Sequence, residues 1–430
     1  MTKTNTANTL AECQALDQED PLRSLRDLFQ VPEGMIYLDG NSLGVLPKAT
    51  PARVAAAVTK EWGQDLIQSW NSAGWFQMPL QVGNKIARLI GAKDDEVVAA
   101  DSTSINLFKV LSAALSIAQA DHPEKKVILS ELTNFPTDLY IAEALCKERG
   151  FSLKLVEAEE LQTALQQDVA VLMLTHVNYR TGAMLNMKAM TALAHSVGAL
   201  TVWDLAHSAG AVPVDLNDSQ ADFAVGCGYK YLNGGPGAPA FVWVHPKHTD
   251  RYWQPLSGWW GHAAPFEFTP DYKPASGITR YQCGTQPILS LTALDTALDA
   301  FLEAEKLGGM KALRLKSLAL TGLFMQLVQS QLQGHGFGIA TPSQDNLRGS
   351  QVSLTRKEGA YAIVQALIAR GVIGDFRAGD GQHHPDILRF GLTPLYTGYA
   401  DVWHAVRHLK EVMDTQEWQQ ARFSQKQAVT

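Results

Sequence analysis

Short apolar runs alternate with longer amphipathic segments between about residues 96 and 244. The runs are hydrophobic throughout, not at every second position, which is typical of strands covered on both faces in a parallel sheet. The longer segments repeat apolar residues at helical spacing. The predicted strands are 96–100, 125–135, 152–157, 169–177, 199–204, 223–225 and 240–244. The pattern therefore predicts an α/β fold in which helices cover a mostly parallel sheet.

The pattern changes after Pro287, where long helical runs become dominant. Helices are predicted over 288–306, 310–333, 357–370 and 399–415, with strands over 350–354, 371–377 and 387–391. This is the pattern of a smaller α+β domain. Near the N-terminus, residues 1–20 are expected to be frayed or loosely helical, and helices are predicted over 48–69 and 79–91. We predict a segment over 1–30 that packs on the small domain, a large cofactor-binding domain over 31–290 and the small domain over 291–430.

Composition narrows the classes of function. The chain has 430 residues, of which 46% are hydrophobic and 18% charged, as in a soluble protein with a sizeable core. A formal net charge of −7 without a basic block disfavours nucleic acid or an anionic membrane as the partner. The N-terminus lacks an apolar run, so neither a signal peptide nor a membrane span is expected. The four scattered cysteines favour the reducing cytoplasm, and no histidine group has the partners of a metal site.

Lys230 is the first candidate for chemistry. It follows the apolar run 223–225 and precedes the turn Asn233-Gly234-Gly235-Pro236-Gly237 and a second apolar run, 240–244. A lysine at the end of a buried strand loses water, which favours the neutral amine that can form a Schiff base with an aldehyde. The alternative is a lysine whose amine extends to solvent. Lys230 alone does not decide between the two.

Asp204 strengthens the first interpretation. It ends the apolar run 199–204, lies 26 residues before Lys230, and is followed three residues later by His207. A carboxylate at the end of a parallel strand can pair with the pyridinium nitrogen of pyridoxal phosphate (PLP) and keep that nitrogen protonated. The alternative is a helix cap with a neighbouring polar histidine.

Two other strand ends carry possible ligand groups. Thr103 and Ser104 lie where a predicted strand meets a long helix, so hydroxyls, free backbone N–H groups and the helix dipole together suit a phosphate. As a helix cap the same turn needs no ligand. Phe135 ends another predicted strand and could stack on a planar ring. In open α/β sheets, ligands bind at these carboxyl ends.

Five motifs, in the order in which they occur along the chain, resemble those of the kynureninase family. Members of this family are PLP enzymes of the aspartate aminotransferase fold, also called fold type I. The motifs are YLDGNSLG at 37–44, NFPTD at 134–138, DLAHSAGA at 204–211, GYKYLNGGPG at 228–237 and GWWGH at 258–262. The resemblance extends from about residue 30 to 400. It implies a mostly parallel sheet of the seven-stranded type between helices, with a smaller α+β C-terminal domain.

The resemblance also implies roles for individual residues. Lys230 would bind PLP covalently, Asp204 would pair with its ring nitrogen, and Phe135 would stack on the ring. Tyr229 would contact the phosphate and could donate a proton. The remaining cofactor-binding residues implied are Thr103, Ser104, Asp138, Thr175 and His207.

Further residues would come from a homodimer with shared sites and from the substrate pocket. Trp259 and Thr285 would reach the phosphate of the partner subunit, while Arg389 would bind the substrate α-carboxylate. Ser42 and Trp70 would line the space for the aryl group. The implied reaction is the hydrolysis of L-kynurenine to anthranilate and L-alanine in tryptophan catabolism. Because Trp70 and Thr285 stand where 3-hydroxykynurenine-preferring members tend to carry histidine and asparagine, we expect kynurenine to be preferred.

Three alternatives remain. An aminotransferase of the same fold would share Lys230, Asp204 and Arg389. A cysteine desulfurase needs a nucleophilic cysteine in the C-terminal region, and none follows Cys283. A non-catalytic PLP-fold regulator usually lacks the lysine or carries an added DNA-binding segment, and the first 30 residues are too short and too acidic for one.

Overall fold

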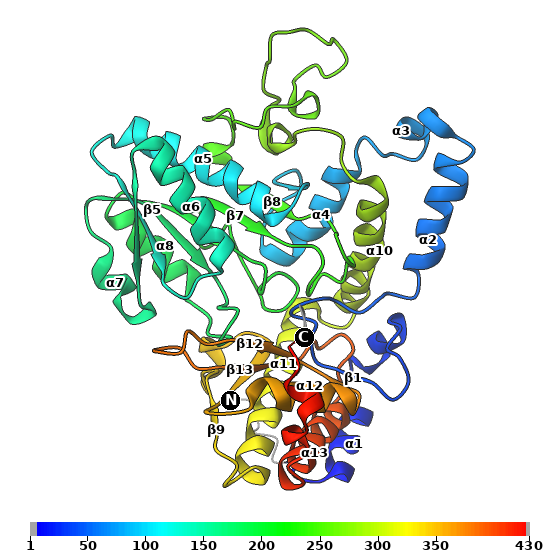
Figure 1. The fold of residues 1–430 in the computed structure, drawn as a ribbon. Helices are drawn as coiled ribbons and strands as arrows, with labels where there is room; N and C mark the ends of the chain where they lie inside the picture. Colours follow the sequence, from blue (N-terminus) through cyan, green and yellow to red (C-terminus); the bar gives the residue numbers. More distant parts are fainter. Residues whose placement is uncertain (1–6, 427–430) are drawn as a thin grey trace.

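A seven-stranded sheet forms the centre of the larger part of the molecule. A computed structural model describes residues 7–426 (Figure 1). The strand order is β2-β8-β7-β6-β5-β3-β4. Strands β3 to β7 pair in parallel, and β8 runs antiparallel to both β7 and β2. The strands are β2 Val97–Ala99, β3 Val127–Glu131, β4 Ser152–Val156, β5 Val169–Thr175, β6 Leu200–Asp204, β7 Phe223–Gly226 and β8 Phe241–Val244. The predicted α/β fold with a mostly parallel sheet is confirmed.

Helices cover both faces of this sheet. Along β5 every side chain is buried, and Met173 and Leu174 belong to different hydrophobic clusters on opposite faces. One face packs against α5 Thr103–Asp121 and α6 Pro136–Arg149. The other packs against α4 Met78–Ile90, α8 Met187–Ser196 and α10 Ile288–Glu305. Burial on both faces explains why the strands are uniformly apolar in sequence.

The small C-terminal sheet has four antiparallel strands in the order β12-β13-β10-β9. They are β9 Phe337–Ile339, β10 Gln351–Arg356, β12 Asp375–Arg377 and β13 Ile387–Gly391. The accompanying helices are α11 Gly309–Gln331, α12 Ala360–Ala369 and α13 Tyr399–Asp414. The N-terminal part joins this region: α1 Leu10–Glu19 packs on α13, and β1 Ile36–Tyr37 pairs with β11 Val372–Ile373. The domain boundaries stay predictions, and α10 packs in the core of the large sheet.

Three local expectations need correction. The predicted strand 371–377 is split at Gly374, where an added Cβ would come within 2.7 Å of the Phe390 ring. Residues 10–19 form a regular helix because Thr9 and Glu12 make a capping box; residues 1–6 lie outside the described part. The predicted helix 48–69 is broken. It consists of α2 Thr50–Ala56, a π-helical turn over Ala57–Trp62, a 3-10 turn over Leu66–Gln68 and α3 Ser69–Ser72, and Leu66 has a φ of 53°.

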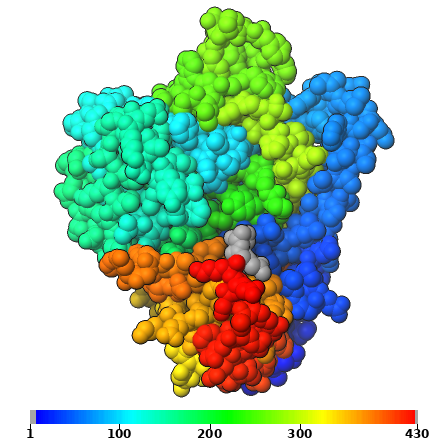
Figure 2. Space-filling model, in the orientation of Figure 1, coloured from blue at the N-terminus to red at the C-terminus, as the bar shows by residue number. Residues whose placement is uncertain are grey.

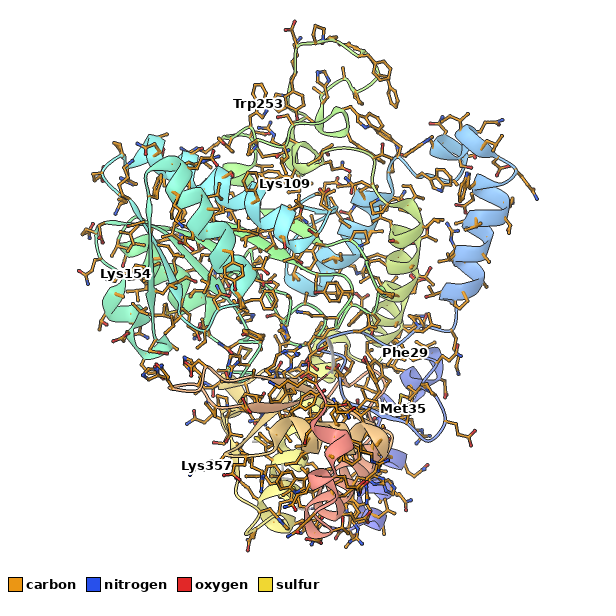
Figure 3. All side chains as sticks on the ribbon, in the orientation of Figure 1. Phe29, Met35, Lys109, Lys154, Trp253 and Lys357 are labelled. Atoms are coloured by element: carbon orange, nitrogen blue, oxygen red, sulfur yellow. The ribbon has the colours of Figure 1, made fainter. Side chains whose placement is uncertain are left out.

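The irregular segment 245–285 projects from the large domain as a lobe (Figures 1 and 2). It contains three short helices, α9 Pro246–Thr249 and the 3-10 turns Trp259–Gly261 and Gly277–Tyr281. Several aromatic side chains on it are exposed, including Trp253, labelled in Figure 3, and Phe268. Short helical segments elsewhere are Arg23–Leu28, Ala158–Glu160, Leu161–Ala164, Asp345–Leu347, Glu417–Gln419 and Ala421–Ser424. Within residues 7–426, no helix combines the length and apolarity needed to span a bilayer.

Candidate active site

A pocket opens at the carboxyl ends of β3, β5 and β6. All nine cofactor-binding residues predicted to act within their own chain line it: Thr103, Ser104, Phe135, Asp138, Thr175, Asp204, His207, Tyr229 and Lys230. They come from strand ends, two helix starts and the loop after β7. The parallel topology brings these residues together, because the strands end at the same edge of the sheet. The pocket also contains Ser102, Thr137, Tyr179 and Ala206, which the sequence did not single out.

Lys230 lies at the centre of this pocket. Its Nζ is 3.0 Å from Nε2 of His207 and lies 5.8 Å from the ring centroid of Phe135. The turn that carries it is tightly packed: Gly44 N donates to the Tyr229 carbonyl at 2.8 Å, and a Cβ on Gly44 would come within 2.5 Å of the Lys230 carbonyl. The motif at 37–44 therefore supports the lysine turn directly.

Two buried carboxyls face Lys230. Asp204 Oδ1 accepts a 2.7 Å hydrogen bond from Ala206 N, and the carboxyl of Asp138 interacts electrostatically with that of Asp204. Burial raises the pKa of Asp204, and the Lys230 charge partly opposes that rise. Burial, followed by the charge of Asp204, raises the pKa of Asp138 well above its usual range. Both shifts favour the neutral form of these carboxyls, and a cationic ring N–H beside Asp204 would favour its charged form instead.

Unpartnered polar atoms test whether a cofactor fits. Among the described residues, the buried Asp138 Oδ2 and His207 Nδ1 have no hydrogen-bond partner. Burial, then the charge of Lys230, lowers the pKa of His207, so the ring is neutral and can bond a ligand oxygen. Buried polar atoms normally have partners. The pocket thus lacks the polar contacts that a planar ligand with ring oxygens and a ring nitrogen would supply, and PLP is such a ligand.

The start of α5 provides the anion-binding end of the pocket. Ser102 caps the helix by accepting from Ile105 N at 3.4 Å, which leaves the first-turn amides beside the hydroxyls of Thr103 and Ser104. Free amides and the positive end of the helix dipole suit a phosphate.

Aromatic and hydrogen-bonded neighbours position the rest of the pocket. Phe135 contacts the edge of Tyr179 with ring centroids 5.3 Å apart. Thr175 donates its hydroxyl hydrogen to Asn134, which itself donates to Ser130 at 3.0 Å. Tyr179 follows the strand ending at Thr175. The same strand-end criterion that singled out Phe135 could have found it.

Trp70, Trp259 and Thr285 do not line this pocket. Trp70 packs against Trp75 and Trp260, with ring centroids 5.7 Å and 5.3 Å apart, and Trp259 lies 5.2 Å from Trp260. Trp70 therefore belongs to the same aromatic cluster as Trp259. The role of Trp70 in the aryl pocket stays a prediction.

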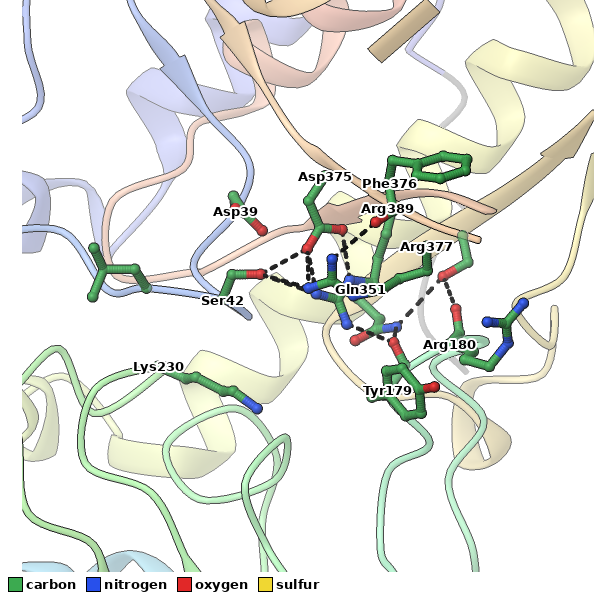
Figure 4. A network of polar contacts seen from close by, with 12 residues as sticks. Asp39, Ser42, Tyr179, Arg180, Lys230, Gln351, Asp375, Phe376, Arg377 and Arg389 are labelled. Atoms are coloured by element: carbon green, nitrogen blue, oxygen red, sulfur yellow. Dashed lines mark hydrogen bonds and ion pairs between the residues drawn. The ribbon is translucent and has the colours of Figure 1, made fainter. Parts of the chain in front are cut away.

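Ser42 and Arg389 meet in a buried polar network beside the pocket (Figure 4). Arg389 donates through Nε to Asp375 Oδ1 at 2.8 Å and also pairs with Asp375 Oδ2. It further donates to the Tyr179 carbonyl at 2.7 Å and to Ser42 Oγ at 2.9 Å. The sequence analysis missed Asp375, because its pairing with Arg389 depends on the register of β12 and β13.

Comparisons with known proteins identify the family. A kynureninase from Pseudomonas fluorescens is 55% identical over 98% of this chain and 100% of its own length. The chain belongs to the kynureninase family. A kynureninase from Burkholderia mallei (strain SAVP1) is 52% identical with the same coverage, and the family model described as "Kynureninase C-terminal domain" matches residues 313–409.

Solved structures agree with the fold of this kynureninase-family chain. A C-DES mutant with glycine covalently linked to its PLP cofactor has a TM-score of 0.77 at 17% identity, covering 90% of this chain and 99% of that one. The apo cysteine desulfurase from Thermococcus onnurineus NA1 has a TM-score of 0.76 at 18% identity, covering 91% and 98%. At such identities the likeness shows the fold alone. Kynureninase-family membership decides against the aminotransferase and desulfurase alternatives.

Proposed function

We propose that the chain hydrolyses L-kynurenine to anthranilate and L-alanine with pyridoxal 5′-phosphate as cofactor. One observation carries the proposal in this kynureninase-family chain: Lys230 lies with two buried carboxyls in a pocket that has unpartnered polar atoms. Lys230 would hold the cofactor through its amine, Asp204 would bind the protonated ring nitrogen, and Phe135 would cover one ring face. Thr103 and Ser104 would bind the phosphate at the start of α5.

Bound PLP supplies an electron-withdrawing ring that stabilises negative charge on substrate carbons. The protein's own groups move the protons. The Lys230 amine would take the proton from the substrate α-carbon, and neutral His207, 3.0 Å away, would hold this amine within the pocket. Burial raises the pKa of Tyr229, so its hydroxyl stays protonated and can act as a donor. Arg389 would bind the substrate carboxylate, with Ser42 beside it.

We also propose a homodimer in the cytoplasm. The cluster of Trp70, Trp259 and Trp260 lies apart from the Lys230 pocket of its own chain, which supports its use in the partner's site. The four cysteines are all free, as suits a reducing compartment.

Subunit mixing tests the dimer. Lys230→Ala and Trp259→Ala variants are expected to be impaired alone, whereas co-refolded mixtures regain about one quarter of the wild-type sites, because half of the dimers then hold one complete site. Mixing wild type with the double variant is the control. A mixture no more active than the separate variants would contradict sharing.

Anthranilate release tests the reaction. PLP-loaded protein is mixed with L-kynurenine and anthranilate is followed by fluorescence, alongside Lys230→Ala and, as a matched control, Lys154→Ala on β4. Wild type and Lys154→Ala should form anthranilate, and Lys230→Ala should not. A wild type that binds PLP but forms no anthranilate would contradict the proposal. On the same assay, kcat/KM should be higher for kynurenine than for 3-hydroxykynurenine.

A further inference from the structure

A second arginine, Arg377, borders the substrate side of the pocket. Asp375 pairs in register with Arg389 across β12 and β13, and Arg377 lies two residues beyond Asp375. Side chains two residues apart on a strand share a face. The antiparallel pairing therefore places both guanidinium groups around one carboxylate (Figure 4).

Arg389 has little capacity left for a ligand. Its side chain is 2% exposed, and its bonds to Asp375, Ser42 and the Tyr179 carbonyl use four of the five N–H donors of a guanidinium. A carboxylate cannot take two bonds from Arg389 unless Ser42 or the Tyr179 carbonyl gives way.

Arg377 is differently placed. Its NH2 lies 2.7 Å from Asp375 Oδ2 and 3.5 Å from Ser42 Oγ, and its NH1 donates to the Phe376 carbonyl at 2.8 Å. Within residues 7–426, its Nε–H and one NH1 hydrogen contact no acceptor. Its side chain is 34% exposed, so these donors can be reached.

The charges around the two arginines leave a positive excess. One carboxylate, Asp375, serves both guanidinium groups. Burial, and next the charge of Asp375, raises the pKa of Asp39 to about 8, so this neighbour is largely neutral at pH 7. Arg389 and Arg377 both lower the pKa of His207, which contacts Lys230. The unbalanced positive charge therefore acts on the reaction pocket.

We propose that Arg377 binds the substrate α-carboxylate together with Arg389, as a second guanidinium whose free donors complete the anion site. This assignment rests on the proposed function, since it concerns an amino-acid substrate held beside Lys230. Asp375 acts as the positioning residue that holds the two arginines side by side. The competing interpretation is that Arg377 only neutralises Asp375.

Two ligands, one with and one without a carboxylate, distinguish these interpretations. L-Alaninamide has a neutral amide where L-alanine has its negatively charged carboxylate. Binding of each to the PLP-loaded wild type and to Arg377→Gln is titrated by cofactor absorbance and by calorimetry. The variant should bind L-alanine about 10- to 100-fold more weakly, the range for a hydrogen bond to a charged group, and alaninamide within about twofold of wild type. Arg377→Lys should recover part of the loss.

The matched control is Arg180→Gln. Arg180 donates to the carbonyls of Ala378 at 2.6 Å and Pro385 at 2.8 Å, and the residue is only 9% exposed, so it supports the loop after β12 from a buried position. Its loss should affect both ligands alike. The assignment would be overturned if Arg377→Gln weakened the binding of L-alanine and L-alaninamide equally, or if it weakened the binding of neither. Circular dichroism checks folding, and Arg377→Lys replaces the glutamine variant if that fails to fold. Because alanine binding needs no kynurenine turnover, this result is separate from the anthranilate assay.

Discussion

Two buried aspartates lie at opposite ends of the neighbouring strands β6 and β7, at the carboxyl and the amino edge of the sheet, and their charges have very different surroundings. Asp222, just before β7, accepts hydrogen bonds from His195 at 2.8 Å and His248 at 2.9 Å and pairs with Lys247 at 2.8 Å. Burial alone would raise the pKa of Asp222, but these partners hold it far below its usual range. Asp204, at the end of β6, has instead a backbone hydrogen bond and the Asp138 carboxyl as a neighbour, and burial raises its pKa.

The different partners of the two aspartates indicate that the charge of Asp222 is structural, whereas that of Asp204 is available to a ligand. Asp222 is compensated within the fold: Thr201 adds bonds from its backbone N at 2.8 Å and its hydroxyl at 3.1 Å. Asp204 is only partly compensated, by the charge of Lys230. Since burying an incompletely paired charge is costly, a cofactor with a cationic ring nitrogen would stabilise the Asp204 edge and not the Asp222 edge.

The largest expected effect is on catalysis at the Asp204 edge. Asp204→Asn keeps the shape but removes the charge that holds the ring nitrogen protonated, so kcat/KM for kynurenine should fall on the order of 10²- to 10³-fold. The stability of the cofactor-free protein should be unchanged or improved, because a poorly paired buried carboxyl is removed. Steady-state kinetics and urea unfolding check both results. A fully active variant would remove the distinction between the two edges.

The next effect is on stability at the Asp222 edge. Asp222→Asn should cost about 3 kcal/mol of unfolding free energy while kcat/KM of the folded enzyme is retained, because a compensated charge network is broken far from Lys230. Since the folded pKa of Asp222 is lowered, its contribution is present above about pH 4 and is lost as the pH falls below that value. The stability deficit of the variant should therefore shrink in acid. Urea titrations between pH 3 and pH 7 would show whether it does.

A smaller effect concerns pH at the Asp204 edge. The folded pKa of Asp138 is raised, so its contribution to stability is present below about pH 4 and is lost as the pH rises. Cofactor-free Asp138→Asn should therefore gain stability relative to wild type as the pH rises from 5 to 8. Thermal unfolding across that range, with and without PLP, measures the gain. A difference that does not vary with pH would contradict the raised pKa of Asp138.

The smallest expected effect is at Ser42. Its hydroxyl donates to Asp375 at 2.7 Å and accepts from Arg389 at 2.9 Å, so it orients charged groups without carrying charge. Ser42→Ala should raise KM for kynurenine about threefold to tenfold, as for the loss of one modest hydrogen bond, with little change in kcat. A large fall in kcat with unchanged KM would place Ser42 in the chemical step instead.

Sequence patterns predicted the pocket better than the network beside it. Asp204 and Thr175 end apolar strands, and Phe135 follows four residues after β3, at the N-cap of α6. One rule, that parallel strands finish at a common edge, places them together. Asp375 and Arg377 followed no such rule. Their proximity to Arg389 depends on strand register and on the break at Gly374, neither of which a hydrophobic pattern specifies.

The packing of the aromatic residue Trp70 was also not predicted from the sequence. Trp70 was predicted to line the aryl pocket, but its packing against Trp260 could not be predicted, because the helix expected over 48–69 is broken near Leu66. A positive φ at a leucine is sparsely populated and leaves no clear trace in the local pattern.

The seam between the two sheets has a mechanical consequence. Arg389 and Arg377 come from strands of the small sheet, whereas Lys230 follows a strand of the large one, and Arg389 reaches across to the Tyr179 carbonyl. An amino acid bound with its carboxylate at one side and its amine at the other would act as a strut of fixed length between the two halves. A ligand with a longer separation between those groups would force the halves apart, so this arrangement would select substrates by length as well as by charge.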